Sequence, residues 1–299
     1  MKGSVYASAL TVLFMSVSLL VSCETKKGTI DIKSYSYADT TEYASVSVSV
    51  ELPASYRGVE AEITNILHQA LDERLSRVTS FEGQRFFQPY DGDLSDNDAF
   101  VKYYFDEVVR LISGLAAQDA EERASYMKED EQMTDAEIKD VLASFPGWEY
   151  EFTLSKIEDT PRYVVFESQD YIYMGGAHGG VGGDGCLTFS KEDGHLVKAI
   201  VEPENQEQMQ SLLRNGLASY FSECGADLDK DALGDYLLID SDNIPLPSWQ
   251  PYPTKDGLVF TYQQYEVAPY AAGMPSFVIQ YDDVLPYLTG DARKVLGMK

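Results

Sequence analysis

Cysteine and histidine are scarce in this chain of 299 residues, which has only three of each. No two cysteines have the short spacing of a zinc-binding pair, and none of His68, His178 and His195 has a second histidine four residues away. This scarcity argues against a zinc site and against a zinc-dependent hydrolase. A Gly-x-Ser-x-Gly turn is also missing, which argues against the nucleophilic serine of α/β-hydrolases.

Basic residues are the second deficit. The chain has 23 Lys and Arg residues against 49 Asp and Glu, for a formal net charge of −26 at pH 7. Proteins that bind nucleic acid need a basic surface to meet the phosphates, so we expect no nucleic-acid ligand. A surface this acidic instead favours solubility and the rapid capture of basic partners.

Metal binding through carboxylates has little support. Two loops, Asp91–Asp98 and Asp227–Asp235, are rich in aspartate. An EF-hand loop needs glycine at its sixth position and glutamate at its twelfth, and neither loop has them. We therefore predict no metal site.

A long apolar run lies near the amino terminus. It follows Lys2 and ends in Leu20-Val21-Ser22-Cys23, which resembles the lipobox of bacterial lipoprotein signals. The pattern predicts a signal peptide over residues 1–22, lipidation of Cys23 and a tether over residues 23–34. A transmembrane anchor is the alternative, because the run is near the lower length limit for spanning roughly 30 Å of hydrocarbon. The first interpretation places the protein in the cell envelope, lipid-anchored to a membrane and facing the periplasm or the cell exterior.

Lipidation of Cys23 leaves two cysteines in an oxidising compartment. Two alternatives follow for Cys186 and Cys224: they form one disulfide, or both remain buried free thiols. The spacing in the sequence does not choose between them, because a disulfide depends on the distance between the two residues in the fold.

Hydrophobic periodicity divides the rest of the chain into two regions. The first, residues 35–145, begins with a strand in which valine alternates with serine at 44–50. An amphipathic helix follows, with apolar residues at helical spacing from Ile63 to Val78. A second helix is expected to begin near Ser95 or Asp96, which are both good N-cap residues, and an acidic surface helix to cover residues 119–141.

The second region, residues 146–299, is richer in strands. A helix is expected at 202–220 and a short closing helix at 282–288. Strand patterns lie at 149–157, 162–174, 185–190, 258–265 and 277–281. Strands and helices in this mixed order predict an α+β fold, in which helices pack against an antiparallel sheet.

Glycine is concentrated between Gly175 and Gly185, around His178. The stretch 180–185 reads Gly-x-Gly-x-x-Gly, but a dinucleotide site needs a helix after the glycines to receive the pyrophosphate. The residues that follow have a strand pattern, and no Lys-Ser or Lys-Thr pair completes a P-loop. We therefore predict no nucleotide and no other cofactor. The glycines are interpreted as a connection between two strands that needs positive φ more than once, and His178 as a residue that holds the turn, with ligand contact as the alternative.

Tyrosine is abundant, with 21 residues. A tyrosine offers a flat apolar face and a polar tip, which suits both sugar platforms and protein interfaces. Ordinary packing at the edge of a core is the alternative. The candidate ligand contacts are Tyr171, Tyr173, His178, Tyr262, Tyr265 and Tyr270.

Two segments resemble a known family. Residues 171–180, Tyr-Ile-Tyr-Met-Gly-Gly-Ala-His-Gly-Gly, are similar to the Tyr-x-Tyr-x-Gly-Gly-Ala-His-Gly signature of the RsiV-like domain of bacterial envelope proteins. Residues 257–288 are similar to the C-terminal signature of the same domain. The resemblance covers residues 148–288 and implies an extracytoplasmic α+β domain, which in PdaC accompanies a deacetylase domain.

The resemblance also implies ligand capture. In RsiV the domain binds lysozyme and triggers release of a sigma factor. Residues 1–22 are too few for a sigma-binding segment, and no deacetylase domain is present, so we expect neither activity. We expect a membrane-tethered module that binds a basic protein such as lysozyme, since its charge is complementary, or peptidoglycan fragments. The alternatives are a glycan-modifying hydrolase with two carboxylates near the glycines, which we favour less, and a structural envelope component.

Overall fold

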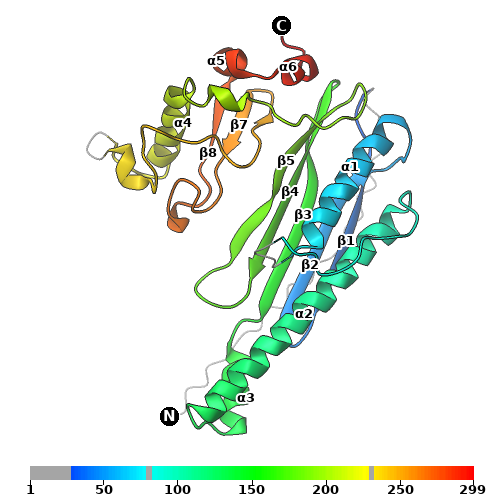
Figure 1. Ribbon diagram of the computed structural model, residues 1–299, viewed down its shortest axis with the longest axis vertical. Helices are drawn as coiled ribbons and strands as arrows, with labels where there is room; N and C mark the ends of the chain where they lie inside the picture. Colours follow the sequence, from blue (N-terminus) through cyan, green and yellow to red (C-terminus); the bar gives the residue numbers. More distant parts are fainter. Residues whose placement is uncertain (1–27, 79–82, 229–231) are drawn as a thin grey trace, which may run out of the picture.

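The computed structural model describes residues 28–78, 83–228 and 232–299 and contains two sheets (Figure 1). The larger sheet has the order β1 (Ile32–Thr40), β2 (Ala44–Pro53), β3 (Trp148–Asp159), β4 (Tyr163–Tyr173), β5 (Gly180–Ser190). The smaller sheet has the order β6 (Tyr252–Pro253), β7 (Gly257–Thr261), β8 (Ser276–Gln280). The described helices are α1 (Gly58–Leu75), α2 (Asn97–Glu129), α3 (Asp135–Ser144), α4 (Gln210–Glu223), α5 (Tyr281–Val284) and α6 (Gly290–Leu296). The α+β prediction is confirmed.

Helices α1 and α2 cover one face of the larger sheet (Figure 1). Val46, Val48 and Val50 point toward this face and are at most 2% exposed, while the serines between them face away, as the alternation predicts. Strand β2 pairs in parallel with β3, whereas the other pairs in the sheet are antiparallel. Parallel neighbours need a long crossover, and the helices α1 to α3 supply it.

A second hydrophobic core lies on the other side of β4. Val164 and Phe166 belong to the core under α1 and α2, whereas Tyr163 and Val165 belong to a core shared with α4 and the smaller sheet. The predicted boundary at residue 146 therefore does not separate the two cores, because one sheet runs across it. The division lies across β4, whose alternating side chains enter both cores.

The predicted helix limits are right at one end of α2 and wrong at the other. Asp96 is the N-cap and accepts a hydrogen bond from the amide of Ala99. The helix then runs for 33 residues, so the acidic helix expected at 119–141 is split between α2 and α3. The second part begins afresh at a capping box formed by Thr134 and Glu137.

The tether prediction is only partly within the described residues. Residues 1–27, with the expected signal peptide and Cys23, lie outside them. From Ile32 onward the expected tether is strand β1, which the sequence did not reveal. Among the helices described, none has the length and apolarity needed to cross a membrane.

Of the two alternatives for Cys186 and Cys224, the disulfide is not formed, because both cysteines are free thiols. Cys186 lies on β5 in the second core and is 5% exposed, and its burial raises the pKa of the thiol strongly. Cys224 caps the C-terminal end of α4 and is exposed, so the alternative of two buried thiols holds for Cys186 alone.

This difference predicts how each thiol reacts. In a Cys23→Ser background, we expect a thiol reagent such as Ellman's reagent to label about one cysteine per native chain and about two after unfolding in urea. Cys224→Ser should abolish the native reaction, whereas Cys186→Ser should leave it unchanged. Equal and rapid labelling of both thiols, or of neither, would contradict the assignment.

His68 on α1 is buried without a hydrogen-bond partner for either ring nitrogen. Its ring is 3% exposed and stacks on Phe100 at a centroid distance of 3.8 Å. Burial lowers the pKa of His68 from 6.5 to about 4, because charging the ring there would cost its hydration. The imidazole is therefore neutral in the folded protein at neutral pH.

The lowered pKa predicts a loss of stability in mild acid. Between pH 6.5 and 4 the unfolded chain binds a proton at His68 that the folded chain does not, so the unfolding free energy should fall as pH falls, by up to about 3 kcal/mol. His68→Leu should lack this contribution. Urea unfolding at several pH values measures it. His195→Gln is the contrasting variant: hydrogen bonds to Asp193 and Asp291 raise the pKa of His195, so removing this histidine should keep the acid-induced loss of stability and not abolish it. Parallel pH profiles for wild type and His68→Leu would refute the assignment.

Candidate functional site

The glycine-rich stretch consists of two parts with different roles. Residues 174–179 form the turn between β4 and β5, and Gly180–Gly185 lie within β5, so the prediction that all these glycines form a connection is wrong. The predicted need for positive φ is confirmed at four of them. These are Gly175, Gly176, Gly183 and Gly185, with φ of 85°, 106°, 128° and 69°.

The glycines inside β5 make room for neighbouring side chains. A Cβ atom on Gly182 would lie 2.7 Å from Oδ1 of Asp170 and would overlap the guanidinium of Arg74. A Cβ atom on Gly185 would lie 2.6 Å from Cγ of Trp249. On Gly183 it would overlap the carbonyl oxygen of Ser168, beside the β-bulge in the β4–β5 register.

A buried ion pair occupies the space beside Gly182. Arg74 of α1 donates from Nε to Oδ2 of Asp170 at 2.9 Å and from a terminal nitrogen to Oδ1. Asp170 is 7% exposed, and the hydroxyl of Tyr150 lies 3.4 Å from its Oδ2. Both oxygens of the Asp170 carboxylate are thus engaged in structure, which leaves little support for Asp170 as an acid or base.

The turn after β4 carries an aromatic cluster, defined by Tyr171, His178, Tyr265 and Tyr270. His178 stacks on Tyr270 at a centroid distance of 3.8 Å, and the hydroxyl of Tyr265 lies 3.4 Å from Nε2 of His178. Nδ1 of His178 lies 2.8 Å from the carbonyl oxygen of Gly179. The ring of Tyr171 packs directly over Gly179, where a Cβ atom would overlap it. His178 is exposed and Tyr265 is 56% exposed, so the aromatic cluster is open to a ligand.

The other two candidate tyrosines lie elsewhere. Tyr262 is fully buried in the second core, and its hydroxyl donates to the carbonyl of Pro245 at 2.7 Å. Its prediction as a ligand contact is therefore wrong, because the side chain of Tyr262, directly after β7, points into the second core. Tyr173 donates its hydroxyl to the carbonyl of Gly176 at 3.1 Å and lies on the opposite side of the turn from His178, against a cavity.

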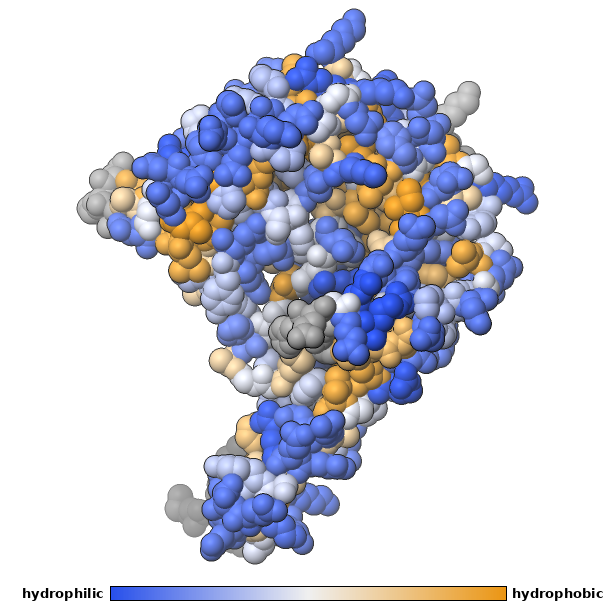
Figure 2. Space-filling view, in the orientation of Figure 1, coloured by the Kyte–Doolittle hydropathy of each residue, from blue (hydrophilic) through white to orange (hydrophobic). Residues whose placement is uncertain are grey.

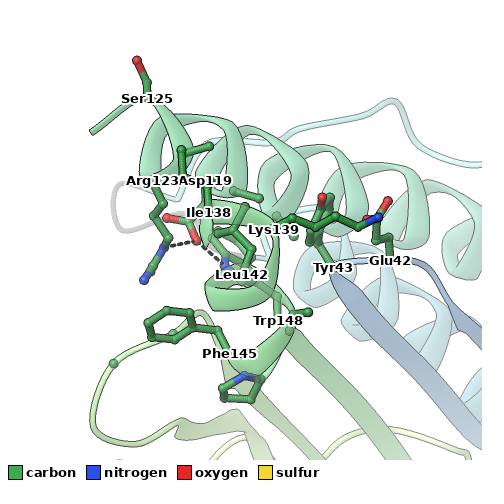
Figure 3. Close-up of a pocket in the computed structure, with 18 of the residues that line it drawn as sticks. Glu42, Tyr43, Asp119, Arg123, Ser125, Ile138, Lys139, Leu142, Phe145 and Trp148 are labelled. Carbon is green, nitrogen blue, oxygen red and sulfur yellow. Dashed lines mark hydrogen bonds and ion pairs between the residues drawn. The ribbon is translucent and has the colours of Figure 1, made fainter. Parts of the chain in front are cut away.

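That cavity, of about 850 Å³, lies between the α2–α3 hairpin and the start of β3. It is in the narrow end of the molecule, whose visible face is mostly hydrophilic (Figure 2). Its walls include Tyr43, Phe145, Trp148 and Tyr173. Asp119 lies beside it and accepts from Nε of Arg123 at 2.9 Å and from the indole of Trp148 at 3.3 Å (Figure 3).

The cavity was missed from the sequence, although α2 carries a signal for it. Ala116, Ala120 and Ala124 recur every four residues and all line the cavity. Alanines at this spacing lie on one face of a helix, which then carries only small side chains. Such a face leaves a hollow wherever the side chains of the opposite wall do not fill the space.

The side of the larger sheet that faces away from α1 and α2 is a further accessible surface, here called the open sheet face. Its positions are half-buried or exposed, and Ser36 and Ser49 pair across it with their hydroxyl oxygens 2.9 Å apart. None of its positions holds a lysine or an arginine. They are Ser34, Ser36, Ala38, Thr40, Ser45, Ser47, Ser49, Glu149, Glu151, Thr153, Gln169, Tyr171 and Tyr173.

Comparison with known proteins places the chain by fold. Residues 199–282 match the family described as "Protein of unknown function (DUF3298)". The crystal structure of a DUF3298-family member from Bacteroides fragilis is similar, with a TM-score of 0.60 and 16% identity over 91% of this chain and 98% of that chain. A DUF3298-family protein from Pseudomonas aeruginosa gives a TM-score of 0.52 and 15% identity over 88% and 94%. No curated protein matches the sequence. Residues 199–282 are thus similar to this family, and the likeness to the two structures concerns the fold alone.

Substitution of two β5 glycines by alanine should show where the absence of a side chain is needed for packing. We expect Gly183→Ala to lower the unfolding free energy by roughly 2 kcal/mol or more, because the new methyl group meets the Ser168 carbonyl in a backbone conformation that L-residues rarely adopt. Gly180→Ala, where nothing lies within 4 Å, is the matched control and should be close to neutral. Urea denaturation measures both, and a neutral Gly183→Ala would disprove the packing role.

Proposed function

We propose that the protein is an extracytoplasmic, lipid-tethered binding module that captures a basic protein through the open sheet face and the adjoining aromatic cluster. The observation that supports it most is the composition of the open sheet face, which combines Glu149, Glu151 and two tyrosines with no basic side chain. A surface of this kind attracts a cationic partner over a distance and offers tyrosines as contact anchors.

The arrangement of charge and aromatic rings supports a protein partner. Tyr171 belongs both to the open sheet face and to the aromatic cluster. It lies directly opposite Glu151 in the β3–β4 register. Its pKa is raised by partial burial and by the nearby carboxylates of Glu149 and Glu151. An arginine or lysine of a partner can therefore meet a carboxylate and an aromatic face at one place.

The position of the site relative to the tether also supports the proposal. The described chain begins at Gly28, whose carbonyl accepts from Lys191 and which lies near Pro161. Strand β1 then runs for nine residues, about 30 Å, to the end of the sheet that holds Trp148 and the glycine turn. If lipid on Cys23 holds the first end at a membrane, the second end points away from it.

The resemblance of residues 171–180 to the RsiV-like signature supports a lysozyme-like protein as the partner. The hydrolase alternative has less support, because Arg74 holds the Asp170 carboxylate in an ion pair.

Binding of a lysozyme at low salt tests the proposal. We expect Glu149→Lys/Glu151→Lys to weaken binding at least tenfold, and Tyr265→Ala to weaken it further by removing an exposed anchor. The control is Glu121→Lys/Glu122→Lys, at two exposed positions of α2, which changes the net charge equally outside the open sheet face. Biolayer interferometry at several salt concentrations measures the affinities.

Three outcomes would overturn the proposal. No retention of lysozyme at low salt is the first, and equal weakening by both double variants is the second, since it would mean that only net charge matters. Binding of peptidoglycan fragments without lysozyme is the third, because it would replace the protein partner with a glycan.

A further inference from the structure

We infer that the cavity between α2 and α3 is a separate binding site for an anionic amphiphile, a molecule with an apolar chain and a carboxylate head. The inference does not depend on the proposed capture of a basic protein, since the cavity lies between α2, α3 and the start of β3 and shares only Tyr173 with the open sheet face. Its volume of about 850 Å³ is within the range of small-molecule sites.

The body of the cavity suits an apolar chain. Ala116 and Ala120 on α2, and Ile138 on α3, are buried where they line it. The facing wall is aromatic, with Tyr43 and Trp148 half-buried. Alanines leave space that a larger residue would fill, and an apolar chain placed there would remove part of the half-buried surface of Tyr43 and Trp148 from water.

The guanidinium of Arg123 indicates that the head group of the ligand is a carboxylate. Its Nε is bonded to Asp119, while the far end of its guanidinium lies near the ring of Phe145, at 5.7 Å from the centroid, and beside Gly175. Figure 3 shows Arg123 and Phe145 on the same side of the cavity. The terminal nitrogens are therefore placed to donate to a carboxylate whose chain enters between Phe145 and the alanines.

The charged residues that line the cavity are balanced in sign. Two more basic residues, Lys128 and Lys139, line the same cavity, and Lys128 is paired with Asp135 at 2.8 Å. Lys139 extends toward Glu42 in Figure 3. The same lining holds three acidic residues, Glu42, Asp119 and Asp135, so the preference for an anionic head rests on the terminal nitrogens of Arg123.

Three ligands with the same chain test the assignment on the full-length protein. Isothermal titration is carried out with dodecanoate, dodecanol and dodecyltrimethylammonium, each below its micelle concentration. We expect dodecanoate to bind at least tenfold more tightly than the other two. Trp148 fluorescence in a Trp249→Phe background should change on binding, because Trp148 lines the cavity.

Matched variants separate the cavity from the rest of the surface. Ala124→Phe should fill the half-buried lining and weaken dodecanoate binding at least tenfold, whereas Ala117→Phe, also half-buried on α2 but outside the lining, should not. Arg123→Met should abolish the preference for dodecanoate over dodecanol, and Arg110→Met, at an exposed arginine of α2, should retain it. Circular dichroism checks that each variant is folded.

The inference is overturned if dodecanoate does not bind, or if Ala117→Phe weakens binding as much as Ala124→Phe. The carboxylate assignment is overturned if wild type binds dodecanol as tightly as dodecanoate. Lysozyme retention is unaffected by these results, so failure here and failure of the proposed function are distinguishable.

Discussion

The ion pair between Arg74 and Asp170 is the interaction on which the placement of α1, β4 and β5 depends. Asp170 is 7% exposed, and a carboxylate at that depth without a partner would cost several kcal/mol. Arg74 reaches it only because Gly182 of β5 carries no side chain in the way. The ion pair therefore requires both the observed position of α1, which carries Arg74, and a glycine at position 182 of β5. Since β5 is fixed by this contact, the turn that precedes it is fixed as well.

Strand β4 sets a second constraint, because both of its faces are buried along the same four residues, Tyr163–Phe166. A strand packed on both faces is continuously hydrophobic instead of alternating. The second core consequently covers only one end of the sheet, over β4 and β5. Strands β1 to β3 are left with an accessible face, and their serines and glutamates at those positions are consistent with contact with water.

The sequence predicts well the elements that are governed by local patterns. The alternation in β2, the Asp96 cap and the strands on either side of the glycines have local causes that a single segment reveals. It does not reveal β1, the parallel pairing of β2 with β3, or the inward side chain of Tyr262, because these depend on partners distant in the chain. Four of the candidate ligand residues gather in one cluster, but the cavity behind them requires the helices to be placed first.

The motif Gly175–Gly179 can be explained by its neighbours on two sides. Toward the cavity, a Cβ atom on Gly175 would lie 2.9 Å from a terminal nitrogen of Arg123. Toward the aromatic cluster, a Cβ atom on Gly179 would overlap the ring of Tyr171, whose position β4 determines. Gly176 has no such neighbour, but its φ of 106° is one that L-residues rarely adopt. Each glycine thus has its own steric or conformational reason, and the turn that they form places His178 in a stack with Tyr270.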